Sequence, residues 1–565
     1  MDTAFSIATL VLLGAPLLVA GAGLLGLKKN ALLMRQLSLF GAGVSFLSAV
    51  VLAYGVVGYG AIDRVFGIVG DPNSFHFSVG VFIDRLSILS VLLITSIGLI
   101  VQKYSVRYLE GDPRQGRFFS WLSFVLFSVT LFVISRNLLA LTLAWFLVSF
   151  GVHRLLLHFS ERESAQKAAW RKFVISRIGD AALILALVLT YSVFGTFELS
   201  QIFEIVKNHG NWEPLTVLGV ALNPAALVGS LYVIGAMTKS AQFPFHIWLP
   251  DTMEAPTPVS ALMHAGIINA GGFLIVRLSP IVAHAGLALH ILFAVGALTA
   301  LFGGLIYLVQ TDIKRSLAYS TIAQMGYMMM QCGVGAFSAA VLHLIMHGFY
   351  KANAFLSAAG RVNTKPITFS ENGQDELPSA YHRGVAALIA GILLVFSILT
   401  LGIDVSQKPG GIFLSLFLWF SATQAIAPAL KNPSGATPLL VVVGLSYGGM
   451  LLYWTALGAV TAFLDPVLML GNQNPIFGEL NSVLVASIAA IYVGVFVLVE
   501  VARMNREKTW AKRFYVLCLN HFYIEQIWRK AVHRILGDSN LMPSFETLAI
   551  PTQVLKEKKN VYSKS

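Results

Sequence analysis

The sequence predicts an all-α polytopic membrane protein, because its apolar residues are abundant, occur in long blocks and are separated by basic loops. Of its 565 residues, 56% are hydrophobic and only 12% are charged, whereas soluble domains carry about 25% charged residues. The apolar blocks are roughly 20 residues long, which is the length of helix that crosses a bilayer core. These properties exclude a soluble globular fold for most of the chain.

About fifteen such blocks follow one another, and each is expected to form one transmembrane helix. Their centres fall near residues 15, 48, 91, 127, 147, 182, 234, 267, 297, 321, 346, 393, 420, 449 and 491. Only the short turn Ser135-Arg136-Asn137 separates the fourth block from the fifth. The chain is therefore expected to cross the membrane an odd number of times.

The net charge of +12 is distributed unevenly between alternate loops. If the N-terminus lies outside, most Lys and Arg residues fall on the cytoplasmic side, as in the 154–177 segment and the tail after Arg503. This asymmetry follows the positive-inside rule and predicts an outer N-terminus and a cytoplasmic C-terminus. The basic excess thus orients the chain, and nucleic-acid binding is not expected.

A lysine and a proline interrupt the seventh apolar block, which reads LYVIGAMTKSAQFPFHIWL. Lys239 lies well inside the block, where a charge costs a few kcal/mol and usually serves a function. Pro244, five residues later, removes a backbone hydrogen bond and breaks the helix. Broken helices with a nearby charge are typical of ion sites in transporters. The alternative is a packing or snorkelling lysine, but Lys239 is too far from either interface to snorkel easily.

Further ionisable residues are expected near Lys239. His264, in the next block, can exchange protons with a buried lysine through water; alternatively it is a hydrogen-bonded core histidine. Arg177 and Asp180 lie one turn apart in the sixth block, either as a gating pair for Lys239 or as a structural ion pair. Asp84 and Lys314 are possible accessory residues, although Lys314 also fits a cytoplasmic anchor.

The eleventh block contains a column of ionisable residues, His343, His347 and Lys351. Their spacing of four places them on one face of a helix, about 6 Å apart along its axis. We favour a proton relay over structural polar packing. A metal site is the weakest alternative, because neither a carboxylate nor a cysteine joins the column.

No cofactor is expected in this chain, which contains neither a glycine-rich dinucleotide turn nor a phosphate loop. The two cysteines, Cys332 and Cys518, lie far apart and form no recognisable metal motif. The chain is therefore not expected to be an enzyme by itself. Residues 505–537 mix apolar and basic side chains, which predicts an amphipathic helix on the inner surface or a docking helix for a partner.

Several runs resemble one protein family: EGDPRQGRFFSWLSF, KFVISRIGD, TKSAQFPFHIWLPDTMEAPTPVSALMHA, TDIKRSLAYSTIAQMGYM and HLIMHGFYKANAFL. They are similar, in order and spacing over about residues 80–360, to the antiporter-like subunits of respiratory complex I (chain L type) and to the large subunit of Mrp sodium/proton antiporters. The resemblance implies two inverted five-helix repeats, discontinuous helices 7 and 12, and a hydrated polar axis.

The same resemblance implies domain boundaries: transmembrane helices 1–3 in residues 1–110, the first repeat in 111–280 and a degenerate second repeat in 281–432. Two C-terminal helices follow in 433–503, and a basic amphipathic tail for partner docking in 504–565. By resemblance, Lys239 is the helix-7 lysine, His264 the helix-8 relay residue and Asp180 the helix-6 acid. His343, His347 and Lys351 correspond to the helix-11 set.

Several departures from the family pattern point to one branch of it. The glutamate that pairs with the helix-7 lysine in complex I and Mrp chains is replaced by Phe146. His153 and His158 replace small or hydroxyl residues of the family. The twelfth block lacks an internal lysine and proline, with Asp404 the only charge near its outer end. Asp180 is then the expected counter-charge of Lys239, unless that lysine has none.

This pattern is similar to the membrane subunits of Dab inorganic-carbon uptake complexes of the bacterial inner membrane. The resemblance implies that H+ or Na+ flow through this chain drives CO2 hydration in a cytoplasmic partner, a zinc protein (DabA) that resembles a β-type carbonic anhydrase. Zinc is thus expected in the partner subunit, and the tail run FYVLCLNHFYIEQIW as the docking element. A proton-pumping subunit of a complex I-like NADH:quinone oxidoreductase and an Mrp-type cation/proton antiporter remain alternatives.

Overall fold

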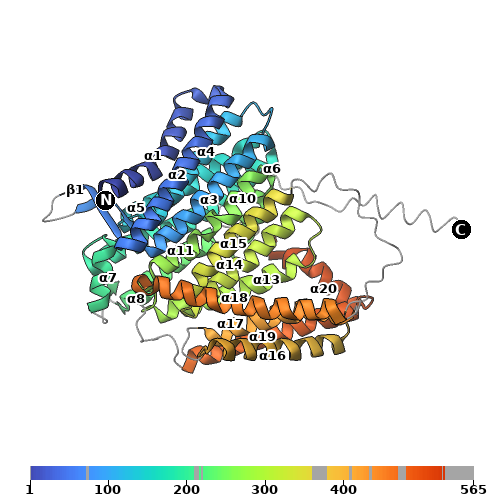
Figure 1. Cartoon of the computed structure of the whole chain (residues 1–565). Helices are drawn as coiled ribbons and strands as arrows, with labels where there is room; N and C mark the ends of the chain where they lie inside the picture. Colours follow the sequence, from blue (N-terminus) through green and yellow to red (C-terminus); the bar gives the residue numbers. More distant parts are fainter. Residues whose placement is uncertain are drawn as a thin grey trace.

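The computed structural model describes residues 2–70, 76–208, 215–217, 220–358, 378–405, 410–431, 436–468, 479–524 and 526–527. These residues are mainly helical (Figure 1). Twelve of their helices are long and apolar enough to cross a membrane, so the chain is a multi-pass membrane protein. The predicted count of fifteen spans and the orientation stay predictions.

The first half of the chain contains the following helices: α1 (Asp2–Leu24), α2 (Ala31–Tyr59), α3 (Arg85–Tyr108), α4 (Gln115–Ile134), α5 (Leu138–Leu156), α6 (Glu163–Phe194), α7 (Leu199–Asn208), α8 (Pro224–Lys239), α9 (Trp248–Asp251), α10 (Thr257–Ala265), α11 (Ala270–Arg277) and α12 (Ser279–Val282). The second half contains α13 (Gly286–Tyr307), α14 (Ile313–Gly333), α15 (Phe337–Ala358), α16 (Ala380–Leu401), α17 (Gly411–Lys431), α18 (Ala436–Leu468), α19 (Glu479–Met504) and α20 (Thr509–Leu519).

Every predicted apolar block coincides with a helix or a broken helix pair. Three blocks fall outside the twelve candidate spans: those of α8, α14 and α15. α8 has only 16 residues, and α8 and α15 carry Lys239 and Lys351. The helices that contain the predicted ion-path lysines are thus shorter or less apolar than their neighbours.

Two short antiparallel hairpins interrupt the helical pattern. Strand β1 (Ile62–Gly70) pairs with β2 (His76–Ile83), and β3 (Leu215–Val217) with β4 (Val220–Leu222). Arg136, between α4 and α5, forms ion pairs with Asp63 of β1 and Glu198. Glu198 in turn accepts a hydrogen bond from the Ser78 backbone of β2 (3.0 Å). This network fixes the first hairpin to the ends of the helices.

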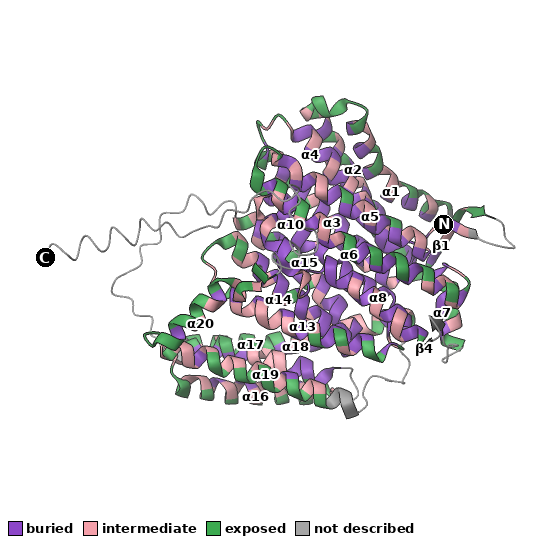
Figure 2. Ribbon diagram, turned by 180° about the vertical axis from the view of Figure 1, so that it is seen from behind, coloured by how far each residue is buried: buried purple, intermediate pink, exposed green. Residues whose placement is uncertain are grey.

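The most deeply buried residues lie in the centre of α3–α6, α8, α10, α11, α14 and α15 (Figure 2). α16, α17, α18 and α19 lie together on one side of this core (Figures 1 and 2). Their faces are more exposed, as expected for helices that contact lipid. α16 is one unbroken helix of 22 residues, so the second discontinuous helix that the family resemblance implies is not found there.

Candidate ion-translocation site

The helix break near Lys239 is the centre of the first polar cluster. α8 begins at the cap Asn223 and Pro224 and ends at Lys239. A turn follows, in which Ala241 has a positive φ of 48° and Phe243-Pro244 is a cis peptide. The carbonyls freed by the break are hydrogen-bonded elsewhere: Trp248 Nε1 donates to Thr238 (3.2 Å), and the Gln242 amide to Met237 (2.9 Å). Lys239 therefore lies at a helix end inside the protein.

The Lys239 ammonium is buried and is held by neutral groups of α5. Its Nζ donates to Ser149 Oγ (2.7 Å) and to the Trp145 carbonyl (3.3 Å), and lies 4.4 Å from the centre of the Trp145 ring. Cation–π contacts of this kind stabilise a desolvated charge by about 2 kcal/mol. Among the described residues, no carboxylate forms an ion pair with Lys239.

Asp180, the expected counter-charge, interacts electrostatically with Lys239 but forms no ion pair with it among the described residues. The indole Nε1 of Trp145 donates to Asp180 Oδ1 (3.1 Å), and Arg177 pairs with Asp180 Oδ2 (2.5 Å). Asp180 is buried, whereas half of the Arg177 side chain is exposed. The acid therefore pairs within its own helix, and the tryptophan contacts both the acid and the lysine.

A second buried lysine, Lys172, belongs to this cluster and was missed in the sequence. Its Nζ donates to the Ser149 carbonyl (2.8 Å), so Ser149 accepts from both lysines. Lys172 and Asp180 lie eight residues apart, which places them two turns apart on one face of α6. That spacing was the available signal, but Lys172 stands in a basic run that was assigned to a loop.

The second polar cluster joins His264 to Lys351. His264 Nδ1 lies 3.0 Å from Thr321 Oγ1, and Thr321 donates its hydroxyl proton to the Leu317 carbonyl (2.9 Å). The same carbonyl accepts from Lys351 Nζ (3.1 Å). His264 therefore donates through Nδ1 to Thr321, while its buried Nε2 has no hydrogen-bond partner among the described residues. The ring also stacks on Phe355 (4.4 Å between centres).

The other histidines of the column extend this cluster along α15. The rings of His343 and His347 lie 5.7 Å apart, and His347 interacts electrostatically with His264, His343 and Lys351. Both ring nitrogens of His347 are buried without a hydrogen-bond partner in the described residues. Such groups are available to accept or donate a proton along the column.

The two clusters meet where the broken helices pack closely. Ser240, directly after Lys239, donates its hydroxyl to the Ile268 carbonyl, between α10 and α11 (2.6 Å). A Cβ at Gly271 would clash with Ser240 and Ala236 of α8, and one at Gly348 would lie 2.9 Å from the Ala265 carbonyl. However, Lys239 and His264 share no direct hydrogen bond in the described residues. Lys239 and His264, which were expected to exchange protons, therefore lie in two neighbouring clusters.

The accessory candidates lie in different environments. Asp84 caps α3 and forms two hydrogen bonds with Arg277 of α11 (2.6 and 2.9 Å), which is a structural ion pair. His153 lies one turn after Ser149, with its ring 5.8 Å from Phe173 of α6, and thus borders the first cluster.

The remaining three candidates lie outside both clusters. His158, just after α5, has its Nε2 atom 2.9 Å from Oδ2 of Asp112, which belongs to the α3–α4 connection. Burial alone would raise the pKa of Asp112, but the hydrogen bonds from His158 and the Arg114 backbone hold that pKa below its ordinary value. Lys314 is half-buried at the start of α14, and Asp404 is exposed beyond the end of α16.

The C-terminal segment contacts the region of the helix break. His521, Phe522 and Tyr523 follow α20 and all have positive φ values, between 53° and 58°. Such a turn is strained for residues other than glycine. Phe522 packs edge-on against Phe302 (4.7 Å between ring centres), which stacks on Phe243 beside Pro244 (5.7 Å). A continuous aromatic chain thus joins the tail to the linker that follows Lys239.

The sequence matches two family models. Residues 135–402 match the membrane domain of NADH:quinone oxidoreductase and Mrp antiporter subunits, and residues 71–119 the N-terminus of complex I chain 5. The chain spans about two fifths of the chloroplast NAD(P)H-quinone oxidoreductase subunit 5 of Chloranthus spicatus, with 41% identity over 52% of its own length. These matches place the chain among antiporter-like, cation-translocating membrane subunits.

One relative matches nearly from end to end. The probable inorganic carbon transporter subunit DabB1 of Halothiobacillus neapolitanus is 34% identical over 93% of this chain and 97% of its own length. DabB2 of the same organism is 35% identical over 71% of both chains. The chain therefore belongs to the DabB group of the antiporter-like family.

Solved structures support the fold. A chain of the Mrp complex from Dietzia sp. DQ12-45-1b covers 99% of this chain with a TM-score of 0.58 and 22% identity, and this chain spans 62% of it. A chain of the archaeal membrane-bound sulfane sulfur reductase covers 90% of this chain with a TM-score of 0.56. Both similarities concern the arrangement of the helices.

Proposed function

We propose that this chain is the membrane subunit of an energy-coupled inorganic carbon uptake complex in a bacterial inner membrane. H+ or Na+ moves through it down its gradient and drives a DabA-like zinc carbonic-anhydrase partner on the cytoplasmic side. The observation that carries the proposal is the buried Lys239 ammonium, which is held by a hydroxyl, a carbonyl and an aromatic ring.

Neutral partners suit a lysine that changes its charge as cations pass. If a carboxylate were paired directly with Lys239, deprotonation of the amine would leave an uncompensated buried acid, which costs several kcal/mol. Ser149 and Trp145 can remain in place in either state, because a hydroxyl can reorient and a carbonyl needs no counter-charge. Asp180 already pairs with Arg177, so its negative charge stays compensated when Lys239 becomes neutral.

The second cluster supplies the continuation of the path. Lys351, the Leu317 carbonyl, Thr321 and His264 form a connected chain of hydrogen bonds. The unpartnered nitrogens of His264 and His347 can pass protons onward through water. This chain of titratable lysines and histidines favours H+ over Na+ as the transported ion.

Comparison with relatives favours the Dab-type function over the complex I-type one. The match to DabB1 extends over 97% of that chain, whereas the match to the chloroplast subunit 5 covers 40% of the relative. The absent acid at Phe146 and the unbroken α16 agree with this choice. A complex I-like subunit remains the second candidate.

The aromatic chain from Phe522 to Phe243 gives the partner a route to the ion site. A subunit that binds the C-terminal segment can move Phe522 against Phe302 and thereby act on the linker after Lys239. This coupling predicts that Phe522→Ala uncouples uptake while the partner stays bound. Tyr523→Ala is the matched control, because Tyr523 is 43% exposed and lies next to Phe522.

The central experiment is co-expression of this chain with a DabA-like zinc protein in bacteria that lack carbonic anhydrase. We expect growth in air only when both proteins are present, abolition of growth by an uncoupler or a sodium ionophore, and zinc in the co-purified partner. Sodium/proton exchange by this chain alone in membrane vesicles, without a partner or growth rescue, would contradict the proposal and favour an antiporter.

A further inference from the structure

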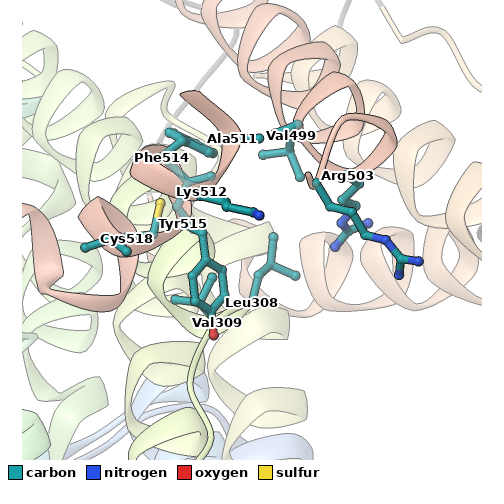
Figure 3. Close-up of a pocket in the computed structure, with 13 residues that line it drawn as sticks. Leu308, Val309, Val499, Arg503, Ala511, Lys512, Phe514, Tyr515 and Cys518 are labelled. Carbon is teal, nitrogen blue, oxygen red and sulfur yellow. The ribbon is translucent and has the colours of Figure 1, made fainter. Parts of the chain in front are cut away.

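A cavity of 440 Å³ lies where two candidate membrane spans end beside α20 (Figure 3). Its apolar walls come from the end of α13 and the residues that follow it, from α19 and from one face of α20, and include Leu305, Leu308, Val309, Val499, Ala502 and Val516. α20 itself is not a candidate span. The cavity therefore lies at the level where a bilayer's apolar core gives way to its polar surface.

Three basic side chains also line this cavity: Arg503, Arg506 and Lys512. Lys512 extends from α20 into the space in front of α19 (Figure 3). Two of the three have acidic neighbours, since Arg503 lies 3.3 Å from Glu500 and Lys512 lies 3.1 Å from Glu507. These neighbours do not cancel the positive charge, because Arg383 also pairs with Glu500. Among the described residues, Arg506 pairs with no carboxylate.

We propose that this cavity binds an acidic phospholipid, with an acyl chain along the apolar walls and the phosphate near Arg503, Arg506 and Lys512. Basic pockets between membrane helices on the cytoplasmic side are suited to anionic lipid head groups. A lipid is favoured over an acidic protein segment because spanning helices form the apolar wall and are already in contact with the bilayer. The lipid site does not depend on the transport role proposed above.

Binding of a lipid here would fix the position of α20. The strained turn at His521–Tyr523 begins two residues after this helix ends. The position of α20 therefore determines the ring contact between Phe522 and Phe302. An acidic lipid would accordingly stabilise the contact between the tail and the body of the protein.

The test is native mass spectrometry of the full chain, purified in detergent with phosphatidylglycerol or phosphatidylcholine added at equal concentration. We expect selective retention of phosphatidylglycerol. The variant Arg506→Gln/Lys512→Gln should weaken retention by ten-fold or more, from about five-fold per basic side chain. Lys508→Gln/Arg513→Gln is the charge-matched control, because both residues are exposed, lie in the same segment and do not line the cavity.

Ala502→Phe provides a variant that keeps every charge but fills the apolar part of the cavity, and it should also lose retained phosphatidylglycerol. Equal retention of both lipids by the unmodified protein would overturn the proposal, as would equal retention by the two double variants. Loss of a bound partner protein from Arg506→Gln/Lys512→Gln with lipid retention unchanged would also overturn it. That result would assign the cavity to an acidic segment of the partner.

Discussion

α8 and α16 are the two helices that the family resemblance makes counterparts in the two repeats, and they differ in length, charge and continuity. α8 ends after 16 residues at the buried Lys239, and a non-helical turn follows. α16 continues for 22 residues, and its buried side chains are only Ala386, Ala390 and Ser397. The comparison teaches that, of these two counterparts, only the broken helix carries a buried lysine; Arg383, the charged residue of α16, lies near the start of that helix and pairs with Glu500.

A buried ammonium needs acceptors that are not already used, and a continuous helix offers none from its own backbone, because its carbonyls bond within the helix. The acceptors therefore come from neighbouring helices, as for Lys351 of the unbroken α15, which donates to the Leu317 carbonyl of α14. At the end of α8 the chain turns, and the Lys239 side chain reaches Ser149 and Trp145 of α5. α16 has no buried lysine; it is unbroken and packs against α17.

The comparison is tested most strongly by Lys239→Gln. Glutamine can keep a hydrogen bond to Ser149 but carries no exchangeable charge, so we expect inorganic carbon uptake to fall by about 100-fold, the scale of losing a proton-transfer group. The measurement is labelled bicarbonate uptake by cells with equal amounts of assembled complex. Lys207→Gln, at the exposed end of α7, is the control. Normal uptake by Lys239→Gln would reduce this lysine to a packing role.

Lys351→Gln tests whether the second cluster is part of the same path. The variant can still donate to the Leu317 carbonyl, so the packing of α14 against α15 is preserved. We expect a reduction of about ten-fold in uptake, because the removed proton carrier belongs to a chain that water can partly bridge. Unchanged uptake, with Lys239→Gln inactive, would confine the path to α5, α6 and α8.

Phe146→Glu restores the acid that the family resemblance places in the fifth span. A carboxylate beside Trp145 would stabilise the charged form of Lys239 and slow its discharge. An added stabilisation of about 1.4 kcal/mol corresponds to ten-fold slower turnover. Phe146→Gln is the matched neutral control. Equal uptake rates in the two variants would show that position 146 does not influence the lysine.

The sequence predicted the helices and the break well, because apolar blocks and a proline act locally. It did not predict the arrangement around Lys239, which depends on packing between helices. Trp145 was given no role from the sequence, yet its ring contacts Lys239 and its indole nitrogen donates to Asp180. Lys172 was assigned to a loop, because a basic run before an apolar block usually marks the membrane boundary. Only the observed length of α6 places it inside the protein.

The smallest expected effect concerns two buried serines, Ser149 of α5, which contacts Lys239 of α8, and Ser397 of α16. Ser149→Ala removes the hydroxyl that accepts from Lys239 and should slow uptake several-fold, in line with about 1.5–3 kcal/mol for a hydrogen bond to a charge, partly offset by the Trp145 ring. Ser397 is the corresponding buried serine of α16 and donates only to Leu394 of its own helix (2.7 Å). Ser397→Ala should leave uptake unchanged. If Ser397→Ala instead slowed uptake as much as Ser149→Ala, α16 would be part of the ion path despite its unbroken backbone and its lack of a buried lysine.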